Sequence, residues 1–113
     1  MKKEKTAFDD WQEKNYTEIS PTLFWDYDLK NFNWYNQENK IIVVQRVIER
    51  GKKQDIYATI RKYGGLDSFI EILKKVPHFN DIDLNYVSKA FNIPLNDLKC
   101  YTNKQLRKQL FSF

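Results

Sequence analysis

The stretch Ile41-Ile-Val-Val-Gln-Arg-Val-Ile-Glu-Arg-Gly51 decides the fold class, because its β-branched start suits a strand whereas its apolar spacing suits a helix. The helical spacing is carried by Ile41, Val44, Val47 and Ile48. No neighbouring stretch has the pattern of a partner strand. We therefore expect a helix between residues 33 and 50 that ends at Gly51. Ile42 and Val43 lie off the apolar stripe, which indicates that this helix is central or contributes to an interface.

Two shorter helices are expected immediately downstream. The first begins with Asp55 as its N-cap and ends at the Gly64-Gly65 pair, and its apolar face consists of Ile56, Ile60 and Tyr63. The second has the clearest pattern in the chain, with apolar residues at i, i+3, i+4 and i+7, namely Leu66, Phe69, Ile70 and Leu73. Pro77 ends it because proline cannot continue a helix.

Residues 84–101 have the spacing of a helix-turn-helix pair. The first helix has either Asp81 or Asp83 as its cap, and its apolar face consists of Leu84, Val87 and Phe91. Asn92 is expected to take a left-handed backbone conformation in the turn, and Pro94 is expected to open the second helix.

The chemistry of the second helix fits DNA reading poorly. It offers Asn96 and Lys99 to a duplex, together with one acid and no arginine that could read a guanine edge. An ordinary pair of core helices therefore remains the alternative. Thr102 and Gln105 then fit a capping box, which predicts a last helix with Leu106 and Leu110 on its apolar edge.

Upstream of all these helices lies Ser20-Pro-Thr-Leu-Phe-Trp-Asp-Tyr-Asp28, which is too aromatic for a solvated loop and too short for a buried helix. We expect residues 20–28, the aromatic plug, to dock their rings onto the core, with Phe24 and Trp25 sealing the helix that ends at Gly51. The sequence thus predicts an all-α fold of five or six short helices, with an irregular aromatic N-terminal segment and one compact domain over residues 19–113.

Residues 1–18 are polar and are expected to form a mobile arm or a short, weakly held helix. Isolated aromatic residues in such a segment can order on binding a partner, or they can fold back onto the same domain. Both alternatives stay open for Phe8 and Trp11. The candidate partner-binding residues are therefore Phe8, Trp11, Phe24, Trp25 and Tyr27.

Charge is unevenly distributed along the 113 residues. Residues 1–38 contain five lysines against eight acids, whereas residues 39–113 contain fourteen Lys and Arg against seven acids. A basic body favours an acidic partner such as nucleic acid, although a solvated surface explains the same residues. The candidates for phosphate or base contact are Arg46, Arg50, Lys53, Arg61, Lys62, Asn96, Lys99, Lys104, Arg107 and Lys108.

Other classes of protein are disfavoured. The longest apolar run, residues 41–44, is far too short for a membrane span, and the N-terminus lacks the apolar region of a secretory signal, so a cytoplasmic location is expected. Cys100 and His78 are single and cannot make a zinc site, and Asp26 and Asp28 suit a turn better than catalysis. No phosphate-binding loop or nucleophile motif is present, so we expect no enzyme, no cofactor and no metal.

Several short motifs resemble a small bacterial family. They are Leu23-Phe-Trp-Asp-Tyr-Asp28, Val47-Ile-Glu-Arg-Gly51, Tyr63-Gly64, Phe91-Asn-Ile-Pro94 and Leu98-Lys-Cys-Tyr101. The resemblance covers roughly residues 20–105 and departs at Asn92, where the family commonly has glycine. The family is a domain of unknown function that is often encoded beside a nucleotidyltransferase toxin of the abortive-infection type.

The resemblance implies an antitoxin-like or accessory module that binds such a toxin by protein–protein contact, and it supplies no active site. A DNA-binding regulator that uses residues 84–101 is the alternative, and a helical domain with a purely structural role is the third reading.

Overall fold

The computed structural model describes residues 6–111, with side chains through residue 106, and its central element is α1 (Gln37–Arg50). Asn36 caps this helix, because its side-chain oxygen accepts hydrogen bonds from the N–H groups of Glu38 and Asn39 at 2.9 and 3.3 Å. The helix buries Val43, Val44, Val47 and Ile48. The ambiguous stretch is thus helical, as predicted.

Gly51 ends α1 through a close approach of the backbone. Its φ of −77° is ordinary, so no left-handed conformation is needed. A Cβ atom at this position would lie 2.6 Å from the carbonyl oxygen of Val47, to which the Gly51 N–H donates a hydrogen bond of 2.9 Å. Any side chain would therefore push the chain away from the end of the helix.

Helices α2 (Lys53–Lys62) and α3 (Leu66–Lys75) both pack against α1 and against each other. The prediction that Asp55 is the N-cap of α2 is wrong: Asp55 lies inside the first turn, where its carboxylate accepts a hydrogen bond from the Lys52 N–H at 2.8 Å. Gly64 and Gly65 connect the two helices with φ of 92° and 124°, conformations that favour glycine.

Helix α4 (Asp81–Ala90) begins at Asn80, whose side chain accepts a hydrogen bond from the Asp83 N–H at 2.8 Å, so neither Asp81 nor Asp83 is the cap. Asn92 has the expected left-handed backbone, with φ of 52°. The predicted second helix from Pro94 does not form. A single 3₁₀ turn, Leu95–Asp97, follows instead, and α5 (Lys99–Phe111) begins only after it.

The capping box predicted at Thr102 is also wrong, because this residue lies within α5. Its hydroxyl donates a hydrogen bond to the carbonyl oxygen of Lys99 at 3.0 Å instead of capping a helix. The buried side chains of Leu98 and Cys100 fix the chain just upstream, so the helix starts earlier than the polar pattern indicated.

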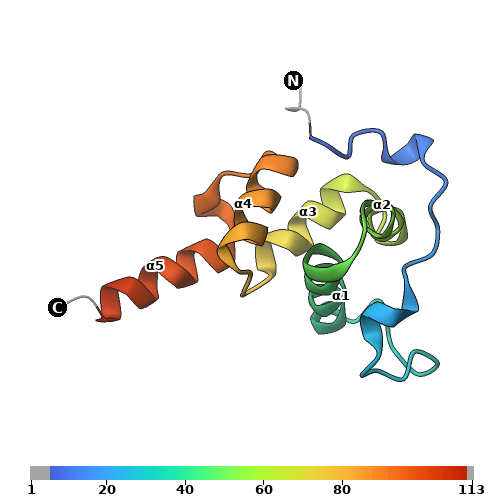
Figure 1. Ribbon diagram of the computed structural model, residues 1–113, viewed down its shortest axis with the longest axis horizontal. Coiled ribbons are helices and arrows are strands. Elements are labelled where there is room, and N and C mark those ends of the chain that lie inside the picture. The colour runs from blue at the N-terminus through green and yellow to red at the C-terminus, as the bar shows by residue number, and fades with distance from the viewer. Residues whose placement is uncertain (1–5, 112–113) are drawn as a thin grey trace.

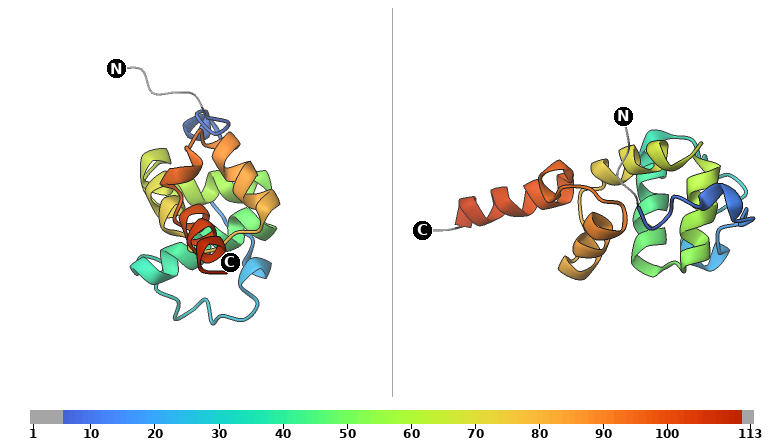
Figure 2. Two further views of the ribbon diagram at one scale, coloured as in Figure 1. Left: turned by 90° about the vertical axis from the view of Figure 1, so that its left-hand side faces the viewer. Right: turned by 90° about the horizontal axis from the view of Figure 1, so that it is seen from above.

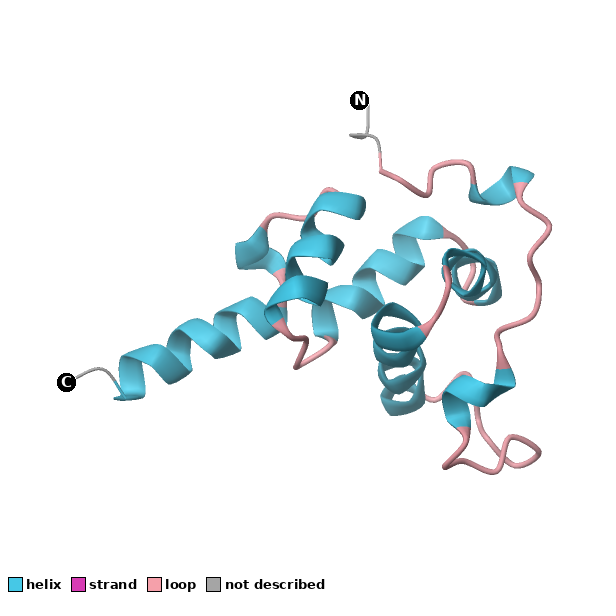
Figure 3. Cartoon of the chain, in the orientation of Figure 1, coloured by secondary structure: helices cyan, strands magenta, loops and turns pink. Residues whose placement is uncertain are grey.

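Figure 1 shows α1, α2 and α3 at one end of the molecule, with α5 extending away from them, and α4 contacts α1. The start of α5 packs against α3 and the Leu95–Asp97 turn, and the right-hand view in Figure 2 shows its far end projecting from the body. Within residues 6–111 the structure contains helices, turns and loops and no strand, so the all-α prediction is confirmed (Figure 3). No helix in this described range has the length and apolarity needed to span a bilayer.

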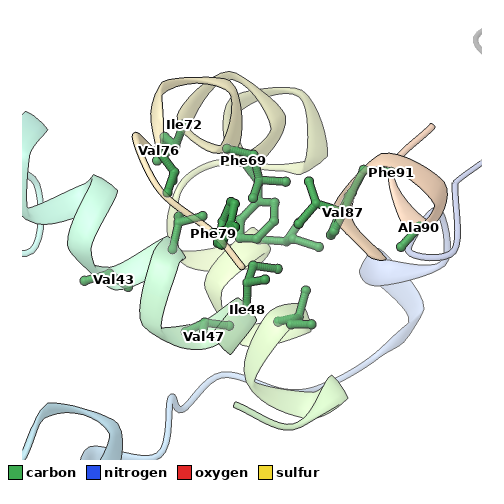
Figure 4. Close-up of a cluster of buried hydrophobic side chains, with 14 of the residues drawn as sticks. Val43, Val47, Ile48, Phe69, Ile72, Val76, Phe79, Val87, Ala90 and Phe91 are labelled. Carbon is green, nitrogen blue, oxygen red and sulfur yellow. The ribbon is translucent and has the colours of Figure 1, made fainter. Parts of the chain in front are cut away.

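The core lies where α1, α3 and α4 meet. Its centre contains Phe69 of α3 and Phe79 of the α3–α4 connection, both without exposed surface, and Ile48 of α1 lies below them (Figure 4). The chain before α1 runs along the outside of α2 and α1 (Figure 1). From this chain, Phe8 and Phe24 belong to the core and Trp11 packs against it.

Candidate partner-binding surface

The aromatic plug divides its side chains between the core and the solvent. The 3₁₀ turn Pro21–Phe24 buries Leu23 and Phe24, whereas Trp25 is 75% exposed and Tyr27 36% exposed. Consecutive side chains along a 3₁₀ helix point in different directions, because this helix has three residues per turn. The prediction that Trp25 seals α1 together with Phe24 is therefore wrong, and only Phe24 fills that role.

A cluster of rings supports the plug from within. The Phe24 ring meets the Trp34 ring edge-on at 5.4 Å between centroids, and Trp34 meets Phe32 in the same way at 4.9 Å. Tyr27 packs edge-on against Phe32 at 5.4 Å. Ring pairs of this geometry each contribute about 0.5–1.5 kcal/mol beyond their buried area. The loop that presents Trp25 is thereby anchored on both sides.

Arg46 of α1 fastens the plug to the body. Its guanidinium forms a two-pronged ion pair with Asp26, in which Nη2 lies 2.7 Å from Oδ2, and Nη1 also donates to the carbonyl oxygen of Leu23 at 3.1 Å. The same group lies 5.0 Å from the centre of the Tyr27 ring. The hydrogen bond from Arg46 holds the pKa of Asp26 below its ordinary value. Arg46 thus fixes the backbone at Leu23, before Trp25, and the side chains of Asp26 and Tyr27, after it.

A shallow pocket of about 290 Å³ opens beside the exposed tryptophan. It lies between the plug and α1, and its lining consists of Trp25, Tyr27, Ile42, Gln45, Arg46, Glu49 and Arg50. Tryptophan, tyrosine and arginine are the residue types that most often dominate the energetics of protein interfaces. An exposed tryptophan on a fixed base beside such a pocket is suited to insertion into a partner protein.

Sequence reasoning missed the α1 side of this pocket. Ile42 and Gln45 contribute to it, and the only signal for them was that Ile42 lies off the apolar stripe of its helix. Phe32 and Trp34, which support the plug, carried no recognisable signal, because their role depends on where the loop after the plug turns back.

The other two candidate partner-binding residues, in the N-terminal arm, are folded against the body. Phe8 has no exposed surface and stacks on Phe91 with 4.9 Å between ring centroids. Trp11 is partly buried, and the Arg61 guanidinium lies 5.7 Å from its ring. These rings contact α2 and the end of α4, so the structure does not bring them to the surface around Trp25.

The predicted nucleic-acid contacts are dispersed over several elements. Three of the cations have partners within the chain: Arg46 is paired with Asp26, Arg61 binds backbone carbonyls of the arm, and Lys104 lies 2.7 Å from Asp81. Others lie over aromatic rings: Lys53 near Phe8 and Tyr57, and Lys62 over Trp34 and Tyr35. Arg50, Asn96 and Lys99 are exposed, and the side chains of Arg107 and Lys108 lie outside the described residues.

Cys100 is buried and structural in its contacts. Its Sγ accepts a hydrogen bond from the Phe79 N–H at 2.9 Å, and it lies 3.5 Å from the carbonyl oxygen of the same residue. His78 is exposed. Within the part of the chain that the structure describes, no three His, Cys, Asp or Glu side chains come together as a metal site.

Comparison with known protein families finds a match for part of the chain. A family model described as "Family of unknown function (DUF6922)" matches residues 19–73, which span the aromatic plug and α1 to α3. No curated protein and no solved structure matches the chain. The matched range includes every residue that lines the pocket beside Trp25, and the chain is in this range similar to an uncharacterised domain family.

Proposed function

We propose that this protein is a non-enzymatic binding module that contacts a protein partner through Trp25, Tyr27 and Arg46. The observation that carries the proposal is the 75% exposure of Trp25 on a loop that is fixed by packed rings and an ion pair. A single exposed apolar residue is ordinary on a protein surface, but Trp25 is held on a fixed loop and lines a pocket together with Tyr27.

The rigidity of the surface favours binding. Association costs free energy for every side chain that must be ordered, and a preorganised surface avoids part of this cost. Arg46 is already held by Asp26 and by the Leu23 carbonyl, and Tyr27 by Phe32. Most of the contact area around Trp25 would therefore need little rearrangement on binding.

The partner in this proposal is a nucleotidyltransferase-type toxin encoded by the neighbouring gene, and the module acts on it in the cytoplasm as an antitoxin-like component. The support for this partner is that the plug and the motif at residues 47–51 resemble the small bacterial family often encoded beside such a toxin. The DNA-binding alternative has less support, because several of its cations are engaged within the chain and the expected recognition helix is replaced by a 3₁₀ turn.

Co-expression with the neighbouring gene product tests the proposal. The wild-type chain is expected to co-purify with that protein and to rescue growth, whereas Trp25→Ala is expected to do neither. Ile82→Ala is the matched control, because Ile82 is an 81% exposed apolar residue on α4. Equal co-purification of all three chains, or of none, would reject the proposal.

A further inference from the structure

The N-terminal arm, defined as residues 6–14, lies on the body as an extended ligand lies on a receptor. It contains one short 3₁₀ turn, Trp11–Glu13, and follows α2 to the end of α4 (Figures 1 and 2). Its contacts with the body begin with a backbone hydrogen bond of 2.7 Å from the Ala7 N–H to the Ala90 carbonyl oxygen. The arm thus covers a surface formed by α2 and the end of α4, which we call the groove, instead of forming a core of its own.

Phe8 is the anchor of the arm. Its ring lies between Tyr57 of α2, edge-on at 5.1 Å, and Phe91, stacked at 4.9 Å, and it has no exposed surface. Next to it, the Tyr57 hydroxyl donates a hydrogen bond of 2.6 Å to the Asp10 carboxylate. Burial of the hydroxyl, together with this bond, raises the pKa of Tyr57 to about 12. The pocket therefore accepts one aromatic ring and one carboxylate.

Arg61 binds the main chain of the arm. Its Nη2 atom lies 2.8 Å from the Lys14 carbonyl oxygen, and at longer distances of 3.3 and 3.4 Å from those of Gln12 and Trp11. Main-chain recognition does not depend on the side chains of the bound segment, so another segment could take the same place.

The arm leaves one donor of Arg61 unused. The Nε atom is buried and has no hydrogen-bond partner among the described residues. A buried donor without a partner costs free energy, and a carboxylate can bind two nitrogens of a guanidinium at once. The groove is therefore better suited to a segment with an additional acidic group than to the arm that occupies it.

The chain between the arm and the aromatic plug allows the arm to leave. Residues 15–18 are exposed, whereas Ser20 is fixed by Asp55, which accepts hydrogen bonds from its N–H at 3.0 Å and from its hydroxyl at 2.8 Å. The arm can thus detach without disturbing the plug. The match to the uncharacterised family begins at residue 19, next to this fixed point.

We infer that the groove beneath the arm is a second binding surface, separate from that around Trp25, and that it takes an extended acidic segment of a partner protein. The segment would carry two aromatic residues three positions apart, as Phe8 and Trp11 are in the arm. In the absence of the partner, the arm occupies the groove. Charge supports this chemistry, because residues 6–14 contain three acids and one cation, whereas the body places Lys53 over the Phe8 ring and Arg61 at the Trp11 carbonyl oxygen.

A labelled peptide with the sequence of residues 6–14 tests this inference on the full-length chain. In the wild type the attached arm competes at an effective concentration in the millimolar range. Phe8→Ala weakens the docking of the arm on the groove and thus its competition with the peptide. This chain is therefore expected to bind the peptide at least about tenfold more tightly than the wild type does. Fluorescence anisotropy measures both affinities, and circular dichroism shows that the variant is folded. Should Phe8→Ala fail to fold, the double change Asp10→Asn with Trp11→Ala weakens the arm and leaves the anchor ring in place.

Two comparisons make the test specific. A peptide with Asn, Asn and Gln in place of its three acids is expected to bind the Phe8→Ala chain at least about tenfold more weakly than the original peptide does. Adding Arg61→Ala to the Phe8→Ala chain is expected to weaken binding of the original peptide by a similar factor. Adding Trp25→Ala instead is the matched control and should leave the affinity unchanged.

The inference is overturned if a folded, arm-weakened chain binds the peptide no better than the wild type, or binds the neutral peptide equally well. Analytical ultracentrifugation provides a second way to overturn the inference. The contradicting result is a wild-type dimer that forms with increasing concentration and is lost in Phe8→Ala. The occupant would then be the arm of a second copy and not a segment of another protein.

Discussion

The aromatic plug and the N-terminal arm are similar in sequence and different in structure. Both are irregular segments with rings among acidic residues, and each is fastened by one arginine of a body helix, Arg46 of α1 or Arg61 of α2. Arg46 binds a carboxylate, a carbonyl and a ring face. Arg61 binds main-chain carbonyls and lies near a ring, and its Nε atom has no hydrogen-bond partner among the described residues.

This difference separates a structural segment from an exchangeable one. The plug is locked by the ion pair and by rings from the following loop, and it holds Trp25 outward. The arm turns its rings inward and has weaker polar attachments. The plug is therefore suited to presenting a contact surface, and the arm to covering one.

The largest effect is expected from Phe24→Ala, which removes the ring that joins the plug to the core. A fully buried phenylalanine is lost, so the free energy of unfolding should fall by about 3–5 kcal/mol. Urea denaturation followed by circular dichroism measures this. The neighbouring change Trp25→Ala is the control and should stay within about 0.5 kcal/mol of the wild type. Equal losses for the two changes would mean that Trp25 is packed.

A smaller effect is expected from Asp55→Ala, because Asp55 fixes the junction between the two segments. Removing its carboxylate leaves the N–H groups of Lys52 and Ser20 without their acceptor, which should cost about 2–3 kcal/mol at neutral pH. Denaturation midpoints of the two chains provide the measurement. A cost below about 0.5 kcal/mol would show that water replaces these bonds.

The cost of Asp55→Ala should depend on pH. Burial alone would raise the pKa of Asp55, but hydrogen bonds from Lys52 and Ser20 outweigh it and hold the folded pKa below the ordinary value of about 3.8. A carboxyl group with a lowered folded pKa stabilises the fold above its unfolded pKa and loses this contribution as the pH falls through the folded value. The difference between wild type and variant should therefore be constant near neutral pH and shrink below pH of about 4. A difference that grew on acidification would contradict this.

A still smaller effect on global stability is expected from Phe8→Ala, although Phe8 is as deeply buried as Phe24. If the arm detaches as a local unit, the cost of the change cannot exceed the free energy of docking the arm, and we expect about 1–2 kcal/mol. Native-state hydrogen exchange should show faster exchange of the Ala7 N–H and little change in α1. A loss as large as that of Phe24→Ala would make the arm an integral part of the core.

The sequence was sufficient to place the first four helices, but not their caps or the start of the last helix. Apolar spacing located α1 and α3, because the buried faces of Val47 and Phe69 repeat at helical spacing. The caps were misassigned because several neighbouring residues were chemically suitable, as with Asn80, Asp81 and Asp83, and tertiary packing selected among them.

The sequence predicted the plug as part of the candidate surface, but not which of its rings is exposed. The plug stood out by composition, but the opposite fates of Phe24 and Trp25 depend on the direction of a 3₁₀ turn and on Arg46, twenty positions away from Asp26. The folded arm was one of two alternatives. The local sequence does not distinguish an aromatic ring that packs on its own domain from one that packs on a partner protein.

The central claim, that Trp25 is exposed in order to bind, is tested most directly by isothermal titration of the neighbouring gene product with wild type, Trp25→Ala and Ile82→Ala. The account predicts that Trp25→Ala loses at least about 2 kcal/mol, roughly a thirtyfold rise in Kd, while Ile82→Ala binds as the wild type does. Equal affinity of the wild type and Trp25→Ala would contradict it.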